Sequence, residues 1–567
     1  MPRSEPSRLV LDRAVGDVAS HCHAWPKEDL TSRIAMLDRM IGATDAVAAD
    51  WVETECGRKR IAVDSPAVGE EWFAGPLIVI RHLRLLRDTL RSIARHGRPH
   101  LPGSLQVLPD GTVVAPVFPT DPYDRLLFMG ITAEVRMLPG VGIEDVQTTI
   151  GGIYRAAPEQ RQGGVAVVLG AGNISAIPAC DVLTKLFAED QVVVLKLSPL
   201  MDDLAPVLES AMGALTEDGY LRIVRCNARE ARHLVAHDLV DSLHLTGSAD
   251  TYDALVFGTG AAAARRKQAG TPRSRRPVTA ELGNVTPLVI VPGPWSDSDV
   301  AYQAEHVATG MANNAGFNCV TTRTVLTQRS WDRREDLLDA LRSVLRRLPN
   351  RDAYYPGARE RFAAMVESHP RAELLGGGGS GTLPWGLLAG IDLETAAGMS
   401  QVETFAPMTI EASVDAASPA EFLDRAVEFC NERMWGTLGI TLVVHPRSLA
   451  DPDTACALER AVEDLRYGTV AVNIWVASAF GLVSPPWGAF PSDDLTDIQS
   501  GRGFVHNTYL LDRPQKTIMR APFRSYPKPA WFVTHRRSRE ALAAATHVNA
   551  TPAPRLLPGL LASATRG

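Results

Sequence analysis

The sequence predicts an α/β protein with two doubly wound parallel sheets, and three observations support this prediction. Strand-like runs such as GVAVVLG, QVVVLKL and LRIVRC alternate with helix-like runs from Gly164 onward. These strand-like runs are mainly apolar, as parallel strands are when helices cover both faces of their sheet. A second α/β section extends from about TAELGNVTPLVIV to YGTVAVNIWV. Such alternation is typical of doubly wound sheets.

The elements before and after these sections are also predicted from the sequence. Ile34, Leu37 and Ile41 recur at helical spacing and predict helices between Leu30 and about Arg95. A Pro/Gly-rich segment with short strands follows, and the C-terminal residues are proline-rich. The basic run RRKQAGTPRSRRP, with six basic residues at 265–276, is predicted to be a solvated loop rather than a phosphate site.

Composition fits a globular protein of two or three domains. The chain has 567 residues, of which 45% are hydrophobic and 22% charged, and its formal net charge is −7. This charge gives no general case for nucleic-acid binding. The N-terminus is interrupted by charges and prolines, unlike a signal peptide, and no membrane-spanning run is found. A cytoplasmic protein is therefore expected, with neither nucleic acid nor membrane as a partner.

The cysteines point to reduced thiols. There are seven, scattered along the chain without CxxC spacing. An odd number without that spacing is typical of a cytosolic protein rather than of a disulfide framework. The run HCHAW places three ligand types side by side, but no second cluster accompanies it. We therefore expect no metal site.

Several turns in the first α/β section carry candidate cofactor residues. Gly170-x-Gly172 resembles the start of a dinucleotide fingerprint, but Ser175 replaces its third glycine. Lys196 stands at the end of the second strand-like run, where a cation suits ribose hydroxyls or a phosphate. Thr246 opens the turn TGS, which is able to approach a pyrophosphate or simply to end a strand.

Three further motifs carry candidate reactive groups. Glu281 lies among small and apolar residues, which favour the raised pKa of a general base, although a helix cap or surface acid fits equally well. Cys319 follows the amide- and glycine-containing run NNAGFN, which suits a nucleophile, whereas most cysteines are buried and inert. Glu403 and Phe405 precede Pro407 in ETFAP, which alone is an ordinary loop.

Taken in order and with their spacing, these motifs resemble the aldehyde dehydrogenase superfamily. The similarity covers roughly Thr31 to Phe523, and the chain is identified as a divergent member with a C-terminal extension. The matching motifs are N-x4-P at Asn173, K-x-S-P at Lys196, TGS at Thr246, ELGN for ELGG at Glu281, N-x-G-F-x-C-x-x-x-R at Cys319, E-x-F-A-P at Glu403, and GTVAVN with SPPWGAF around Asn473 and Trp487.

The resemblance implies two Rossmann-like domains, a β-strand oligomerisation element, and a homodimer or homotetramer. It also implies oxidation of an aldehyde to the carboxylic acid by NAD or NADP through a covalent cysteine thiohemiacetal and thioester. The implied roles are: catalysis for Cys319, Glu281 and Asn173; cofactor binding for Lys196, Ser198, Thr246, Gly247, Ser248, Glu403 and Phe405; and the substrate pocket for Ile174, Phe317, Asn318, Phe480 and Trp487.

The resemblance also divides the chain into segments. The segment GFVHNTYLLDRPQKTIM is a candidate oligomerisation strand. The expected segments are: 1–281, N-terminal helices and cofactor-binding domain, with a stretch near 110–160 as a candidate part of the oligomerisation element; 282–490, catalytic domain; 491–523, return segment and oligomerisation strand; and 524–567, extended tail.

Departures from the family pattern leave alternatives open. Pro199 occupies the place of a glutamate that often favours NAD, so NADP is admissible. Tyr252, Asn284 and Phe317 replace two glycines and a glutamine. An acyl-CoA reductase or CoA-acylating dehydrogenase is the first alternative, because the basic run suits the phosphates of CoA, although Glu281 favours hydrolysis. A non-catalytic scaffold of the same fold is the second.

Overall fold

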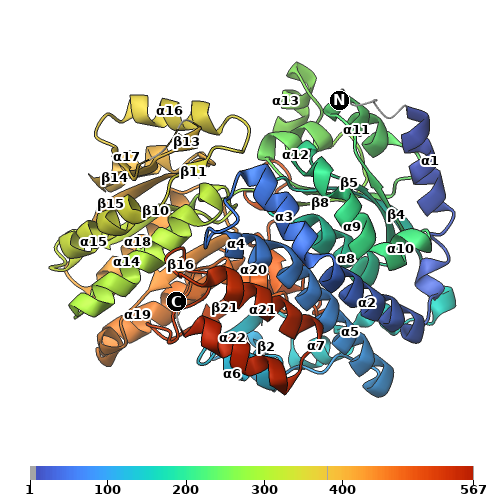
Figure 1. The fold of residues 1–567 in the computed structure, drawn as a ribbon, viewed down its shortest axis with the longest axis horizontal. Coiled ribbons are helices and arrows are strands. Elements are labelled where there is room, and N and C mark those ends of the chain that lie inside the picture. The colour runs from blue at the N-terminus through green and yellow to red at the C-terminus, as the bar shows by residue number, and fades with distance from the viewer. Residues whose placement is uncertain (1–7, 378, 380, 566–567) are drawn as a thin grey trace.

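The computed structural model describes residues 8–377, 379 and 381–565, and it contains two large sheets with helices around them (Figure 1). The first is six-stranded, in the order β19-β8-β7-β4-β5-β6, and its five longer strands run parallel. Its strands are β4 (Gly164–Leu169), β5 (Gln191–Lys196), β6 (Leu221–Val224), β7 (Ser242–Thr246), β8 (Val278–Glu281) and the antiparallel edge strand β19 (Gly501–Arg502).

Helices connect the strands of this first sheet. The strand order reverses beside β4, because the chain first adds β5 and β6 on one side and then β7 and β8 on the other. Ligands of doubly wound sheets bind at such a reversal, outside the carboxyl ends of the strands. The connecting helices are α8 (Ile177–Glu189), η5 (Pro199–Leu204), α9 (Ala205–Ala211), α10 (Gly213–Glu217), α11 (Ala228–Ala236), α12 (Ala249–Val256) and α13 (Ala261–Gln268).

The second sheet has eleven strands, and seven neighbouring strands at its centre are parallel. The parallel strands are β9 (Thr286–Ile290), β10 (Thr322–Gln328), β14 (Trp385–Ile391), β15 (Met408–Val414), β16 (Gly439–Val443), β17 (Thr469–Val472) and β21 (Pro514–Arg520), and the antiparallel ones are β1 (Gln106–Val107), β2 (Val113–Phe118), β3 (Thr132–Met137) and β12 (Glu373–Leu375). The predicted α/β class with parallel sheets is confirmed.

Helices and short strands surround this second sheet. The helices are α14 (Asp297–Ala312), η6 (Asn313–Gly316), α15 (Arg334–Arg347), α16 (Ala358–Ser368), α17 (Leu393–Met399), α18 (Pro419–Glu432), η7 (Pro446–Ala450), α19 (Pro452–Asp464) and α20 (Ser478–Leu482). Two small sheets pair β11 (Arg351–Asp352) with β13 (Thr382–Leu383), and β18 (Pro486–Gly488) with β20 (Phe504–His506).

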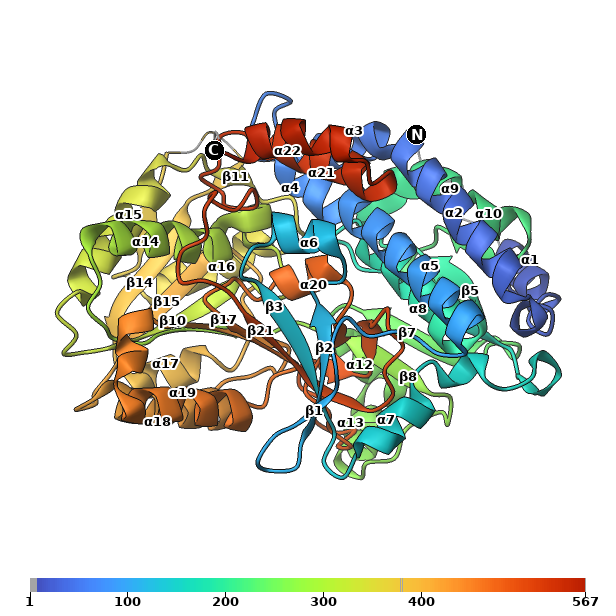
Figure 2. The ribbon, with the colours of Figure 1, turned by 90° about the horizontal axis from the view of Figure 1, so that it is seen from below.

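The strand predicted to pair with another copy lies inside the sheet of its own chain. β21 runs parallel to β17 on one side and antiparallel to β3 on the other. Its backbone groups are therefore paired in both directions, and the outermost strands of the sheet are β1 and β12. Figure 2 shows β1, β2 and β3 beside β21 where the two halves of the molecule meet.

Helices are present between Leu30 and about Arg95, as predicted, and the N-terminal helices pack on the first sheet and its helices α8 and α9. The π-helical turn η2 contains Gly75 and Pro76, and a Cβ at Gly75 would lie 3.0 Å from both Ser175 Oγ and Trp51 Nε1. This turn therefore needs glycine because the first sheet approaches it closely. The N-terminal elements are α1 (Arg8–Ala19), η1 (Trp25–Lys27), α2 (Leu30–Ala46), α3 (Ala48–Lys59), α4 (Val68–Trp72), η2 (Phe73–Leu77), α5 (Ile78–His96), α6 (Pro122–Leu127), α7 (Ile143–Thr149), η3 (Gly152–Tyr154) and η4 (Pro158–Gln160).

The C-terminal tail differs from the predicted extended segment. From Ser538 it forms α21 (Ser538–Ala550), followed by η8 (Pro554–Leu556) and α22 (Leu557–Ala564). The run SREALAAATHVNA is rich in alanine, the strongest helix former, and this outweighs the prolines on either side. α21 packs on α4 and η2, where Leu542 joins a buried cluster with Trp72. Figures 1 and 2 show both tail helices lying across the N-terminal ones.

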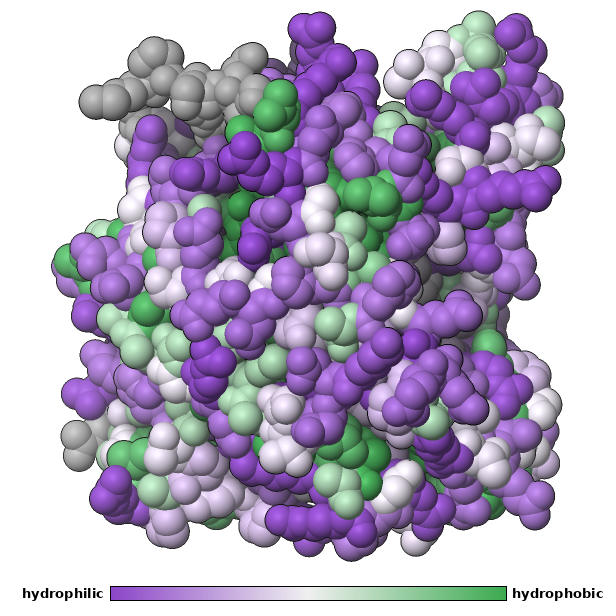
Figure 3. Space-filling model, turned by 90° about the vertical axis from the view of Figure 1, so that its right-hand side faces the viewer, coloured by the Kyte–Doolittle hydropathy of each residue, from purple (hydrophilic) through white to green (hydrophobic). Residues whose placement is uncertain are grey.

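The basic run is part helix and part loop. Arg265 to Gln268 form the last residues of α13, and only the residues after them are irregular. The surface in Figure 3 is mainly hydrophilic, with hydrophobic residues in scattered patches. Among the described residues, no helix has the length and apolarity needed to cross a bilayer.

Candidate active site

Cys319 lies in a strained loop between α14 and β10. Asn314 and Ala315 both have left-handed backbone conformations, with φ of 52° and 57°. This region is unfavourable for alanine, and asparagine tolerates it better. A Cβ at Gly316 would lie 3.1 Å from the Cα of Pro407, so only glycine allows the loop to approach that segment. The loop therefore depends on its surroundings to keep its shape.

The Cys319 thiol lies beside the carboxyl group of Glu281, the last residue of β8. The Sγ atom donates a hydrogen bond of 3.5 Å to Glu281 Oε1. Burial, with a smaller contribution from the charge of Asp181, raises the pKa of Glu281 to about 7. Burial and the carboxylates of Glu281 and Glu403 raise the pKa of Cys319 well above its usual range. A neutral thiol thus lies beside a group that is poised to take its proton near pH 7.

Asn173 brings a side-chain amide from the first sheet to the same loop. It lies in the turn between β4 and α8, and its Nδ2 donates to the backbone oxygen of Phe317 at 2.9 Å. An amide nitrogen carries two hydrogens, so this bond uses one of them. Asn173 therefore approaches the loop of Cys319 with one N–H that remains for another acceptor.

The amide of Asn314 connects this loop to the N-terminal helices. Its Oδ1 accepts hydrogen bonds from Lys59 Nζ at 3.0 Å and from the Tyr354 hydroxyl at 2.8 Å. Its Nδ2 donates to the backbone oxygens of Asn173 at 3.2 Å and of Phe317 at 3.3 Å. The side chain of Asn314 thus connects α3, the turn after β4 that contains Asn173, and the residues just before Cys319.

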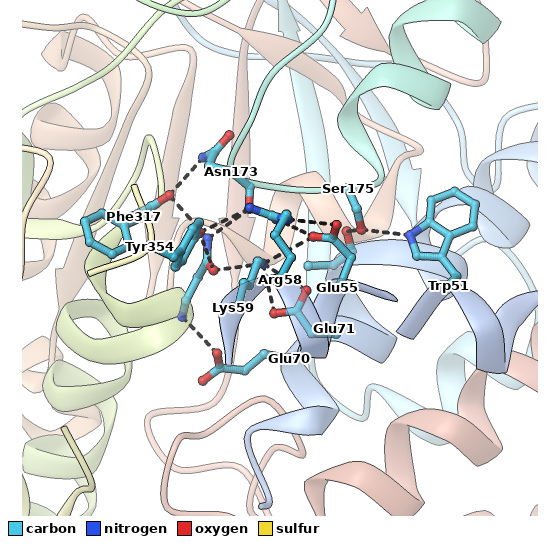
Figure 4. A network of polar contacts seen from close by, with 12 residues as sticks. Trp51, Glu55, Arg58, Lys59, Glu70, Glu71, Asn173, Ser175, Phe317 and Tyr354 are labelled. Carbon is cyan, nitrogen blue, oxygen red and sulfur yellow. Dashed lines mark hydrogen bonds and ion pairs between the residues drawn. The ribbon is translucent and has the colours of Figure 1, made fainter. Parts of the chain in front are cut away.

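Buried charges of α3 and α4 support this asparagine (Figure 4). The Lys59 ammonium lies 2.8 Å from both carboxylate oxygens of Glu71, and both side chains are 1% exposed. Glu70 accepts the backbone N–H of Asn314 at 3.0 Å and pairs with Arg351 at 3.2 Å. A buried charge that loses its partner is strongly destabilising. These ion pairs therefore help to hold the loop of Cys319 in place.

Glu403 fills the space next to Gly283. A Cβ at Gly283 would lie only 1.8 Å from Glu403 Oε2, so the approach requires glycine. Burial raises the pKa of Glu403 to about 7, and the positive charge of Arg323 opposes the rise. Glu403 Oε1 has no hydrogen-bond partner among the described residues. A shielded acceptor of this kind suits a ribose hydroxyl.

Phe317 is completely buried among aromatic rings. Its ring centroid lies 5.0 Å from that of Tyr354, 5.9 Å from that of Tyr355 and 5.9 Å from that of Phe405. Phe405 itself has a left-handed backbone, with φ of 42°. Phe317 therefore packs the loop of Cys319 against the segment that carries Phe405 and Glu403.

The predicted cofactor residues of the first sheet lie at the carboxyl ends of its strands. Lys196 ends β5, and Ser198 caps the following turn by accepting the Leu200 N–H at 3.4 Å. A Cβ at Gly172 would lie 2.6 Å from Ser198 Oγ, which explains the glycine of the β4 turn. These residues border the point where the strand order reverses, as a dinucleotide site requires.

The TGS turn ends β7 at the same edge. The Thr246 hydroxyl donates to Asp181 Oδ2 at 2.9 Å and is thus occupied within the protein. Gly247 is exposed, and Ser248 caps α12 by accepting the Thr251 N–H at 3.3 Å. The turn therefore offers an exposed edge beside the helix N-terminus of α12.

The remaining predicted pocket residues are spread around the loop. Asn318 is buried and donates to Asn313 Oδ1 at 2.9 Å, so it stabilises the loop internally. Ile174 is half-buried beside Asn173, and Phe480 packs 5.6 Å from the buried ring of Trp487. Of the five predicted pocket residues, Phe317 included, Ile174 and Phe480 are the ones with partly exposed side chains.

Sequence reasoning missed the supporting residues Lys59, Glu71, Tyr354 and Arg351. A signal existed, because ECGRKR and GEEW place charges at helical positions whose neighbours are apolar. These charges support the loop because Lys59 binds Asn314, which lies 255 residues further along the chain. A single sequence does not show such a pairing.

Comparisons with known proteins give a family match over part of the chain and a likeness in fold. Residues 161–369 match the aldehyde dehydrogenase family, and a comparison with curated proteins finds no match. An indole-3-acetaldehyde dehydrogenase complexed with NAD+ aligns with a TM-score of 0.59 and 17% identity, over 91% of this chain and 89% of that one. The NADP-dependent glyceraldehyde-3-phosphate dehydrogenase of Bacillus halodurans, complexed with NADP, gives 0.59 and 16%, over 90% and 91%. An NAD-dependent aldehyde dehydrogenase of Sinorhizobium meliloti gives 0.59 and 18%, over 92% and 89%. At these identities the likeness shows the fold.

The pKa of Glu281 predicts the pH dependence of Cys319 alkylation. Above about pH 7 the Glu281 carboxylate is ionised and accepts the thiol proton. The rate of labelling by iodoacetamide should therefore be low below pH 7 and should increase as the pH is raised through 7. Peptide mass spectrometry resolves Cys319 from the other cysteines, with exposed Cys456 as the internal control. Glu281→Gln should remove the inflection, and its survival in that variant would show that another group titrates.

Lys59→Met tests the buried support of the loop. The change leaves Glu71 buried without its cation and removes a donor from Asn314, so we expect a loss of about 3–5 kcal/mol of stability. Thermal unfolding measures it. Lys267→Met is the matched control, because Lys267 pairs with Asp253 at the surface. Equal effects of the two changes would contradict the supporting role.

Proposed function

We propose that the protein is an aldehyde dehydrogenase that oxidises an aldehyde to a carboxylic acid with NAD+ or NADP+. The family match of residues 161–369 and the likeness in fold support this proposal. One observation carries the proposal: the Cys319 thiol donates to a buried carboxyl group, Glu281, whose pKa is about 7. A nucleophile and a base matched to neutral pH are what acyl chemistry on sulfur needs.

The proposed reaction uses three side chains in turn. Glu281 takes the thiol proton, and Cys319 Sγ forms a bond to the aldehyde carbon while the carbonyl electrons move to oxygen. The Asn173 amide and the Cys319 N–H stabilise that oxyanion, each by about 3 kcal/mol in a preorganised site. When the oxyanion electrons re-form the C=O bond, the hydrogen on that carbon leaves as hydride, for which a bound cofactor would supply the acceptor, and a thioester remains on Cys319. Glu281 releases its first proton to solvent and then removes a proton from water, whose oxygen bonds to the thioester carbon. The C–S bond breaks to release the acid, and Glu281 returns that proton to the Cys319 sulfur.

We propose that the cofactor is bound at the carboxyl ends of β4, β5 and β7. Lys196 and Ser198 would hold the adenosine ribose, and the unpartnered oxygen of Glu403 would accept a hydroxyl of the nicotinamide ribose. Pro199 opens η5, so no carboxylate at that position repels a 2′-phosphate. Both NAD+ and NADP+ are therefore proposed as cofactors.

An apolar or aromatic aldehyde is the proposed substrate class. Cys319, Phe128, Phe480 and Trp531 all pack against one hydrophobic cluster. Trp531 comes from the tail, and its ring lies 6.4 Å from that of Phe73 and 6.5 Å from that of Phe128. These four aromatic side chains are half-buried, so each retains an accessible face. Aromatic side chains favour apolar partners.

CoA acylation is the alternative that a specific observation keeps in view. Arg265, Arg273 and Arg275 are exposed on or just after α13, and clustered guanidinium groups bind phosphates. Glu281 opposes this reading, because a base beside the thiol favours attack by water.

A panel of aldehydes with NAD+, NADP+ and CoA in parallel tests the proposal. We expect reduction of a dinucleotide without acyl-CoA, and a loss of about 10³-fold or more in Cys319→Ser. Cys456→Ser is the matched control, since Cys456 is exposed on α19. Acyl-CoA formation would support the alternative, and activity that survives Cys319→Ser would exclude the nucleophile.

We also propose a cytoplasmic protein, since all seven cysteines are unpaired. A homodimer or homotetramer follows from the family resemblance, but β21 is paired on both sides within its own chain. Assembly must therefore use other surfaces. Light scattering after gel filtration should give two or four times the chain mass, and a mass of one chain would contradict assembly.

A further inference from the structure

Three side chains with metal-binding atoms meet in the interior, and neither Cys319 nor Glu281 is among them. His82 comes from α5, Cys180 from α8 and His506 from β20. One ligand atom of each residue lies within 4.8 Å of the ligand atoms of the other two. The three residues are far apart in the sequence, so only the packing of the N-terminal helices, the first sheet and the return segment brings them together.

The two imidazoles are buried without hydrogen-bond partners. His82 and Cys180 are 0% and His506 is 2% exposed. None of the four ring nitrogens has a partner among the described residues. A neutral imidazole carries one N–H and one lone pair, and a buried polar group left unsatisfied costs about 1–3 kcal/mol. Two such rings side by side therefore call for a bound species that uses their lone pairs.

The surroundings hold the rings in place but satisfy none of their nitrogens. The ring centroids of His82 and His506 lie 5.2 Å apart, and Phe480 covers His506 at 4.3 Å. His506 and Asn507 have left-handed backbones, with φ of 67° and 53°. The His506 N–H donates to Thr184 Oγ1 at 3.3 Å. The unusual backbone thus presents the imidazole to the cluster.

The chemistry of these atoms selects the ion. Thiolate sulfur and neutral imidazole nitrogen are preferred ligands of Zn²⁺, whereas Ca²⁺ and Mg²⁺ require oxygen atoms. Both imidazoles make no hydrogen bond with the described residues, so each offers a nitrogen lone pair to an ion.

We propose that His82, Cys180 and His506 bind one Zn²⁺ ion, which joins α5, α8 and β20. On binding, the Cys180 thiol loses its proton to solvent and a Zn–S bond forms, while each histidine gives one nitrogen lone pair. Ligand distances of about 2.0–2.3 Å require the three side chains to close around the ion, with a fourth position left for water. The role is structural, and it is independent of the proposed function.

The test uses the full chain, purified without a histidine tag. We expect about one equivalent of zinc by elemental analysis. After its removal with a chelator, we expect a lower melting temperature that Zn²⁺ restores. Co²⁺ should then give the thiolate-to-cobalt charge-transfer band of a sulfur ligand. Absence of zinc together with absence of the cobalt band would overturn the proposal.

Variants separate this site from the chain's other thiols. Cys180→Ala should abolish the charge-transfer band, and His82→Gln should weaken cobalt binding by about tenfold or more. Cys319→Ala and Cys430→Ala are the controls, since Cys430 is an equally buried cysteine. A band that survives Cys180→Ala, or disappears in Cys319→Ala, would overturn the proposal. The chelator and Co²⁺ measurements on the unaltered chain remain decisive if Cys180→Ala does not fold.

Discussion

The shape of the reactive loop depends on one side chain, the amide of Asn314. The loop turns through two left-handed residues, and such backbone persists only where surrounding contacts over-determine it. Asn314 supplies those contacts in both directions, because its oxygen accepts from Lys59 and Tyr354 while its nitrogen donates to the backbone oxygens of Asn173 and Phe317. The same amide therefore sets the position of the loop of Cys319 relative to the side chain proposed to stabilise the oxyanion. Charges on α3 and α4, although remote from the substrate, are part of what makes the site precise.

Burial around Cys319 has opposite effects on the reacting groups. It raises the pKa of the thiol well above its usual range, which weakens the nucleophile, and it raises that of Glu281 to about 7, which strengthens the base. Glu403 adds a second carboxyl group that also titrates near 7. At neutral pH both carboxyl groups are therefore partly protonated, and the site carries less negative charge than two ionised carboxylates would. A cationic nicotinamide ring would favour the thiolate, so the proposed cofactor would also help to activate the nucleophile.

The strands and the order of the site motifs were predictable because each depends on local sequence: apolar runs mark β4 and β5, and glycines mark the turns after them. The structure adds reasons that the sequence does not contain. Gly172 and Gly283 are glycines because a Cβ at these positions would lie 2.6 Å from Ser198 Oγ and 1.8 Å from Glu403 Oε2, and neither neighbour is close in sequence. The tail is helical, contrary to the prediction, because the alanine-rich run of α21 outweighs the prolines on either side. The pairing of β21 depends on β17 and β3, which lie far from it in the sequence.

The N-terminal helices connect these observations. α3 and α4 support the loop of Cys319, α5 brings His82 to the return segment at His506, and Phe73 of η2 lies beside Trp531 of the tail. One helical layer thus contacts the first sheet, the loop of Cys319 and the last elements of the chain. The return segment contributes both His506 of the histidine pair and β21, which is paired on both sides within its own chain. The proposed metal ion would therefore join α5 and α8 to the segment that leads into β21.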